Sequence, residues 1–198
     1  MKIEITDEIK DMFAELINTG VGHAAASLNQ LLNYEIGLTV PSIIILENVI
    51  ELIEYMKSKH SDKNIFVTQL FKGKLSGKGI VMFPVIGGKT LVNLLIDKGD
   101  SSEPETFNVI ESDAMLEVGN MILNAVQSTI SDMSGIEIIC GLPQIVLNGV
   151  DTLIKEEKEN YYIVCEMIFS VKETKIHGMI FLIYTYQNLE ILIDKFLK

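Results

Sequence analysis

Residues 11–25 read DMFAELINTGVGHAA, and residues 113–120 read DAMLEVGN. Both stretches place an aspartate, a glutamate and an asparagine at the spacing D-x-x-x-E-x-x-N, and the second copy follows the first by 102 positions. Pro41 and Pro143 are separated by the same 102 positions. The chain of 198 residues is therefore predicted to consist of two internal repeats of one unit.

Hydrophobic periodicity predicts the same order of elements in both halves, α-β-α-β-β-α. In the first half (about 1–100) these are helices or short amphipathic stretches over 7–32, 49–56 and 89–96 and strands over 38–46, 66–71 and 74–84. In the second half (101–198) they are helices or short stretches over 112–133, 150–154 and 188–197 and strands over 137–147, 161–171 and 175–184. The expected fold class is α+β, with a single pseudo-two-fold domain over 1–198, a mostly antiparallel sheet and two long helices that carry the motif.

Helix geometry predicts where the motif side chains point. An α-helix turns by about 100° per residue, so with Asp11 at zero, Glu15 falls near about 40° and Asn18 near about −20°. On the same scale Phe13 and Leu16 fall between about 140° and 220°. The polar triplet therefore forms a stripe that points away from the apolar stripe, and the second copy gives the same arrangement.

Two interpretations of this stripe remain open at the level of sequence. Any amphipathic helix that packs on a core carries polar residues on its outer face. The same residue types at the same spacing in two helices favour a shared function for the two motifs. Duplication alone would preserve the same pattern, so the spacing by itself does not decide between them.

A glutamate and an asparagine three residues apart are neighbours on a helix surface. The amide of an asparagine both donates and accepts hydrogen bonds, so it can hold a water molecule in a fixed direction. Phosphoryl transfer depends mostly on positioning, and the glutamine of GTPases orients the attacking water in this way. Because a convex helix face forms no closed pocket, this pair suits hydrolysis of a phosphate presented by another protein.

The stretch from Asp11 through Asn18 to Ala25 resembles the signature of the CheC family, and residues 113–120 match the same signature. These proteins are chemotaxis phosphatases that act on the phosphorylated response regulator CheY. The resemblance covers essentially the whole chain. The presence of two motifs is similar to CheC itself, whereas CheX-type relatives resemble a one-motif, dimerising version.

The resemblance implies catalytic roles for four residues. Asn18 and Asn120 would orient the attacking water, and Glu15 and Glu117 would pair with the active-site lysine of the regulator. The Mg²⁺ ion of the reaction would sit in the regulator, so no cofactor or metal is expected in this chain. Besides the CheY-like regulator, the resemblance implies CheD, a receptor-modifying deamidase, as a possible partner.

Four further residues are candidates for supporting roles. The resemblance assigns Asp11 and Asp113 to the first motif position, where they would support the site. His23 could line the docking face, although a histidine on a helix surface needs no function. Gly22 and Gly20 could allow close approach of a partner backbone. For Gly20, tight helix packing in the core is an equally good explanation.

One position departs from the family pattern. The residue before the family asparagine is commonly glycine, as is Gly119, but Ile17 occupies this position in the first copy. Helix geometry places Ile17 at about 240°, toward the edge of the core, so we expect the isoleucine to be tolerated.

Composition excludes several classes of partner. The net charge of −11 disfavours nucleic acid and anionic membrane surfaces. No apolar run approaches the roughly 20 residues of a membrane helix, so we expect no membrane insertion. Cys140 and Cys165 lie in apolar stretches and are expected to be buried, reduced thiols of a cytoplasmic protein. Gly88-Lys89-Thr90 ends like a P-loop, but Phe83 stands where that motif needs its first glycine.

The sequence therefore predicts a phosphatase that hydrolyses the aspartyl phosphate of a phosphorylated response regulator (CheY-P) in chemotaxis signalling. The alternative is a binding or adaptor module, with little or no catalysis, that sequesters CheD or the phosphorylated regulator. A third interpretation is a component of the flagellar switch.

Overall fold

The computed structural model describes residues 3–32, 35–59, 63–96, 106–147, 160–171 and 173–197. The elements of the first half are α1 (Asp7–Leu32), β1 (Ile36–Leu46), α2 (Val49–Lys59), β2 (Asn64–Gly73), β3 (Gly77–Pro84) and α3 (Val85–Leu95). Those of the second half are α4 (Val109–Ser134), β4 (Ile138–Cys140), β5 (Gln144–Leu147), β6 (Asn160–Val171), β7 (Thr174–Thr185) and α6 (Tyr186–Leu197). The helices α1 and α4 have 26 residues each and lie 102 positions apart, in step with the motif.

The strands of both halves join one antiparallel sheet. Its order is β1-β6-β7-β3-β2-β4, and β5 also pairs with β2. The central pair, β3 and β7, contains the corresponding strand of each half. The strands that come first in each half pair with a strand of the other half. β1 pairs with β6, while β4 and β5 pair with β2. The α+β fold with a mostly antiparallel sheet is therefore confirmed.

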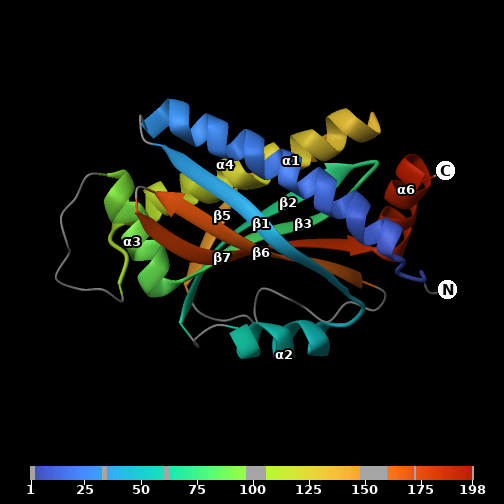
Figure 1. Cartoon of the computed structure of the whole chain (residues 1–198), viewed down its shortest axis with the longest axis horizontal. Coiled ribbons are helices and arrows are strands. Elements are labelled where there is room, and N and C mark those ends of the chain that lie inside the picture. The colour runs from blue at the N-terminus through green and yellow to red at the C-terminus, as the bar shows by residue number, and fades with distance from the viewer. Residues whose placement is uncertain are drawn as a thin grey trace.

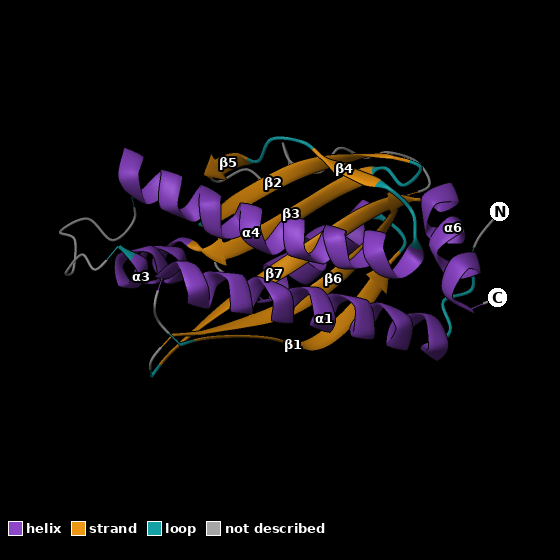
Figure 2. Ribbon diagram, turned by 90° about the horizontal axis from the view of Figure 1, so that it is seen from above, coloured by secondary structure: helices purple, strands orange, loops and turns teal. Residues whose placement is uncertain are grey.

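The helices cover the sheet unequally. Both long helices, α1 and α4, lie on one face, and α2 lies on the other (Figure 1). Seen from above, α1 and α4 lie beside one another along the sheet, with α3 near one end and α6 near the other (Figure 2). The two motif-bearing helices therefore present their outer sides on the same face of the molecule.

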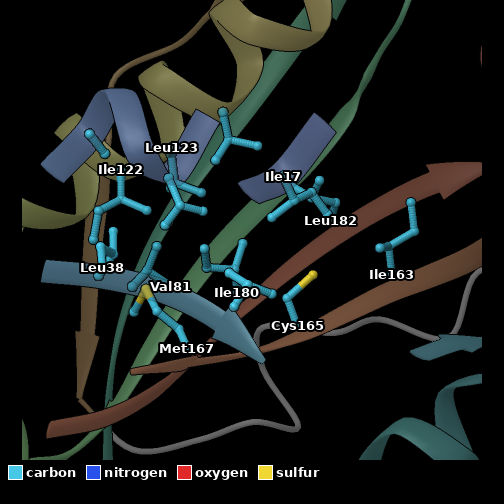
Figure 3. Close-up of a cluster of buried hydrophobic side chains, with 14 of the residues drawn as sticks. Ile17, Leu38, Val81, Ile122, Leu123, Ile163, Cys165, Met167, Ile180 and Leu182 are labelled. Atoms are coloured by element: carbon cyan, nitrogen blue, oxygen red, sulfur yellow. The ribbon is translucent and has the colours of Figure 1, made fainter. Parts of the chain in front are cut away.

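The main core fills the space between the long helices and the sheet. Ile17 from α1 and Leu123 from α4 point toward sheet residues such as Val81, Cys165 and Leu182 (Figure 3). These side chains are fully or almost fully buried. A second apolar cluster on the other face joins α2 to the sheet. The apolar stripe predicted for each long helix therefore faces the core.

Several predicted boundaries differ from the structure. The helix α4 begins three residues before the predicted Ser112, because Asn108 caps it. The helix α3 begins directly after Pro84 rather than at Lys89. The single strand predicted over 137–147 is two short strands, β4 and β5, and the stretch predicted over 150–154 lies outside the described residues.

The two cysteines differ in exposure. Cys165 is buried, and burial raises the pKa of its thiol well above the ordinary value. Cys140 is only partly buried, because its strand lies at the edge of the sheet, and the expectation of a buried thiol is wrong there. Within the described ranges, no helix is both long and apolar enough to cross a membrane.

Candidate functional site

The first motif lies on the outer side of α1. Asp11, Glu15 and Asn18 are exposed, whereas Phe13 and Leu16 on the opposite side of the helix are buried. Asn18 forms no side-chain hydrogen bond in the described part of the chain. Its carboxamide therefore has both its donor and its acceptor available to a partner.

Of the residues around Asn18, some pack in the core and others are exposed. A Cβ atom on Gly20 would lie 2.7 Å from the Cα atom of Val126, so this glycine lets α1 approach the backbone of α4. A Cβ atom on Gly22 would meet no atom within 4 Å, and this position is exposed. Ile17 is 0% exposed and points into the core, so it does not crowd the face that carries Asn18.

His23 links the two long helices. Its Nδ1 atom lies 3.1 Å from Oγ1 of Thr129 on α4, a hydroxyl that is otherwise buried. The imidazole remains exposed to solvent on its outer side. His23 therefore lies five positions beyond Asn18, where it contacts α4 and is also exposed to solvent.

The second motif occupies the corresponding face of α4. Asp113 and Glu117 are exposed, and Asn120 is half-buried. Gly119 packs against the sheet, since a Cβ atom there would lie 2.4 Å from Cβ of Val67. The glycine before this asparagine is therefore explained by the close packing of α4 on β2.

Asn120 belongs to a network of side-chain amides that has no counterpart around Asn18 among the described residues. Its Oδ1 atom accepts hydrogen bonds from Nε2 of Gln69 at 3.3 Å and from Nδ2 of Asn124 at 2.9 Å. Gln69 lies on β2 and is 3% exposed. Its Nε2 atom also lies 3.0 Å from Oδ1 of Asn124 and 2.9 Å from the carbonyl oxygen of Gly141. Because this nitrogen carries two protons, one is donated to Gly141 and the other is shared between the two asparagine oxygens. The two motifs therefore share residue types but differ in surroundings.

Gln69 and Asn124 were not among the residues predicted from the sequence. Asn124 stands four positions after Asn120, a spacing at which helix side chains meet. Gln69 is a polar residue within the otherwise apolar strand segment IFVTQLF at 65–71. Both signals are visible in the sequence, but the contact between them depends on how α4 packs against β2.

The motif carboxylates have no cationic partner in the part of the chain that the structure describes. Across the described ranges, none of the side chains of Asp11, Glu15, Asp113 and Glu117 forms an ion pair. In a chain with a net charge of −11, these exposed carboxylates can attract a cation on a docked molecule. Among the residues that the structure describes, no group of three or more metal-ligating side chains is found.

The motif side chains lie on the outer sides of α1 and α4, where all but the half-buried Asn120 are exposed. A hollow of about 330 Å³ lies along β2, β4 and β5, and its lining includes Leu70, Ile139 and Gln144 but no motif residue. An amide and a carboxylate on a convex face can orient a water molecule and pair with a cation only if another molecule brings the reacting group. The geometry therefore suits a docking face and not a small-molecule pocket.

The chain is similar in sequence and in fold to several known proteins. No family model matches the chain. The chain is 25% identical over 156 residues to the CheY-P phosphatase CheC of Bacillus subtilis (strain 168), a match that covers 77% of this chain and 72% of that protein. The structure of Thermotoga maritima FliY has a TM-score of 0.78 and 19% identity, with 98% of each chain covered.

Two further solved structures share the fold. The FliM middle domain from H. pylori has a TM-score of 0.68 and 11% identity, with 96% of this chain and 99% of that chain covered. A chain of the CheX–CheY–BeF3–Mg²⁺ complex from Borrelia burgdorferi has a TM-score of 0.52 and 17% identity, with 83% and 96% covered. The sequence match and the shared fold together confirm that this chain resembles the CheC family, as its duplicated motif indicates.

Proposed function

We propose that this chain hydrolyses the aspartyl phosphate of a phosphorylated, CheY-like response regulator. The observation that supports the proposal is the pair of Glu–Asn motifs on the outer sides of α1 and α4, in a chain similar to a CheY-P phosphatase. Asn18 and Asn120 would orient the attacking water. Glu15 and Glu117 would pair with a lysine of the docked regulator.

This reaction does not require these residues to form a covalent bond with the phosphoryl group. Hydrolysis of a phosphoryl group depends on placing the water in line with the bond that breaks and on stabilising the charge that develops. A carboxamide can hold the water, and a carboxylate can anchor a lysine. Under this proposal the Mg²⁺ ion belongs to the regulator and not to this chain.

The proposal rests on the motif rather than on the fold. The FliM middle domain shares the fold at 11% identity, so the architecture alone does not distinguish a phosphatase from other proteins of this shape. None of the relatives reported above is named for an interaction with CheD, and the proposal is confined to the response regulator. A protein that only sequestered the regulator would also use an exposed face, so turnover is the property to measure.

The test is dephosphorylation of a CheY-type regulator at substoichiometric amounts of this chain, with Bacillus subtilis CheY as the reference substrate. The parent should shorten the phosphoryl lifetime catalytically. The double variant Asn18→Ala, Asn120→Ala should lose about a hundredfold or more in rate, as happens when one positioned donor is removed from other active sites. Far-ultraviolet circular dichroism should show an unchanged fold, because Asn18 is exposed and Asn120 is half-buried.

The matched control is Gln30→Ala, Ser128→Ala, which removes exposed polar side chains from the same two helices about two or more turns beyond the motif asparagines. This control should retain the activity of the parent. The proposal fails if the asparagine double variant stimulates dephosphorylation as the parent does. It also fails if the parent merely titrates the regulator with a stoichiometric end point.

A further inference from the structure

The amide network beneath the second motif is oriented by a backbone atom. Nε2 of Gln69 donates to the carbonyl oxygen of Gly141 at 2.9 Å. A carbonyl oxygen can only accept, so this bond settles which end of the Gln69 carboxamide carries the nitrogen. The same nitrogen lies 3.0 Å from Oδ1 of Asn124 and 3.3 Å from Oδ1 of Asn120. Both asparagine oxygens therefore point inward.

Asn124 adds a second donor to the same oxygen. Its Nδ2 atom donates to Oδ1 of Asn120 at 2.9 Å, one helical turn away. The carbonyl of Asn120 thus accepts from two side chains, and its Nδ2 atom is the end that stays available. The terminal torsion of an asparagine is otherwise broad, so an unsupported carboxamide samples both orientations. The network selects one of them.

The first motif lacks both supports. The position four residues after Asn18 is Gly22, which has no side chain to donate. The buried side chains that β1 and β6 contribute to the core below the long helices are mostly apolar, among them Leu38, Ile163 and Cys165. Among the described residues, therefore, none orients the carboxamide of Asn18 as Gln69 and Asn124 orient that of Asn120.

We propose that Gln69 is a positioning residue of the second site, which holds the Asn120 carboxamide with its nitrogen facing outward, and that the first site works without such support. This inference rests on the proposed phosphatase function. It gives the second site a fixed donor toward the docked regulator. A preorganised donor needs no reorientation at the moment of reaction, so the support acts on turnover rather than on docking.

Single-site backgrounds test the inference. In the Asn18→Ala background only the second site remains, and Gln69→Leu should lower kcat about tenfold with KM nearly unchanged, since misplacing a reacting group can cost up to about a hundredfold. In the Asn120→Ala background only the first site remains, and the same Gln69→Leu change should leave kcat unaltered. A merely structural role would lower both backgrounds alike.

Two controls separate orientation from folding. Thr68→Val alters the neighbouring residue on β2, which lines the hollow on the other face of the sheet, and should leave both backgrounds unchanged. Asn124→Ala removes the other donor to Oδ1 of Asn120 and should also lower kcat, again only at the second site. Thermal unfolding of each variant should show that all of them are folded at the assay temperature.

The side-chain amide signal of Asn120 in a ¹⁵N nuclear magnetic resonance spectrum gives a readout that needs no activity. Gln69→Leu should shift this signal, while the Asn18 signal stays in place. Equal effects of Gln69→Leu in both backgrounds, or none in either, would overturn the inference. So would an inactive Asn18→Ala variant of an active parent, because Gln69 would then have no turnover to support. A parent without activity refutes the proposed function instead, and the amide spectrum still reports whether Gln69 orients Asn120.

Discussion

At the scale of single residues, the repeat preserves residue types more faithfully than their surroundings. Ile17 and Gly119 stand at equivalent positions, and both are buried. Ile17 fills core space below α1, whereas Gly119 allows α4 to lie against Val67. The residue before each asparagine is therefore set by the distance between helix and sheet, and neither faces the docking side.

Substitution by alanine should have opposite effects on stability at two glycines of α1. Gly22→Ala should raise the free energy of unfolding by about 0.5–1 kcal/mol, because its Cβ would meet open space and alanine favours the helix. Gly20→Ala should lower that free energy by about 1–3 kcal/mol, because its Cβ would press on the backbone of Val126. Urea denaturation followed by circular dichroism measures both changes. Two shifts of the same sign would contradict the packing described for α1 and α4.

At the scale of elements, the start of α4 is held by a buried ion pair. Nζ of Lys89 on α3 lies 2.6 Å from Oε2 of Glu111, and both side chains are almost fully buried. Oε2 of Glu111 also accepts from the backbone N–H of Asn108 at 2.9 Å, while Oδ1 of Asn108 accepts from the backbone N–H of Glu111. This capping box and the lysine together fix where the second motif-bearing helix begins.

Removing one partner of this pair should cost more than removing both charges. Lys89→Met leaves the Glu111 carboxylate without its lysine and should destabilise the chain by about 3 kcal/mol or more. In the double variant Lys89→Met, Glu111→Gln the buried charge is gone and glutamine still accepts from Asn108, so part of the loss should be recovered. A double-mutant cycle in urea gives the coupling energy. Additive losses would show that the two side chains do not interact in solution.

The elements also show how far sequence patterns reach. Period-3.6 patterning predicted both long helices and the direction of their polar stripes, because burial of one face dominates helix placement. It did not predict the break between β4 and β5. Pro41 stays inside the edge strand β1, where the register shifts between Thr39 and Ser42, whereas the equivalent Pro143 lies between two short strands. A proline at the edge of a sheet can lie at an irregularity within a strand or can separate two strands. The pairing with neighbouring strands decides which of these occurs.

The candidate site divides in the same way. The four residues Glu15, Asn18, Glu117 and Asn120 were predicted from the duplicated spacing together with the resemblance to the CheC family. Helix geometry predicts that they point away from the core, and in the structure three are exposed and Asn120 is half-buried. The contact of Gln69 with Asn120 joins residues 51 positions apart and depends on the depth at which α4 packs. Local patterns contain no information on that depth, so the difference between the two motifs became visible only in the structure.

At the scale of the whole molecule, the two halves exchange strands. The partner of β1 in the sheet is β6 of the second half, while β4 and β5 pair with β2 of the first half. The central β3–β7 pairing and the contact between α1 and α4 also join the halves. Taken separately, each half would retain one hairpin, β2–β3 or β6–β7, and a lone two-stranded hairpin is at best marginally stable in water.

Peptides 1–100 and 101–198 should therefore each be largely unfolded alone and should gain native circular dichroism when mixed in equal amounts. A circular permutant that starts at residue 101 and joins residue 198 to residue 1 through a short linker is the matched control. It keeps every strand pairing, and α6 ends near the start of α1 (Figure 2), so it should fold and unfold in one cooperative transition. If either half alone unfolds cooperatively in urea, then the repeat units are independent and the exchanged strands are not what holds the fold together. If the halves fail to combine while the permutant folds, then covalent linkage is required for pairing, and the strand exchange alone is too weak to assemble the sheet.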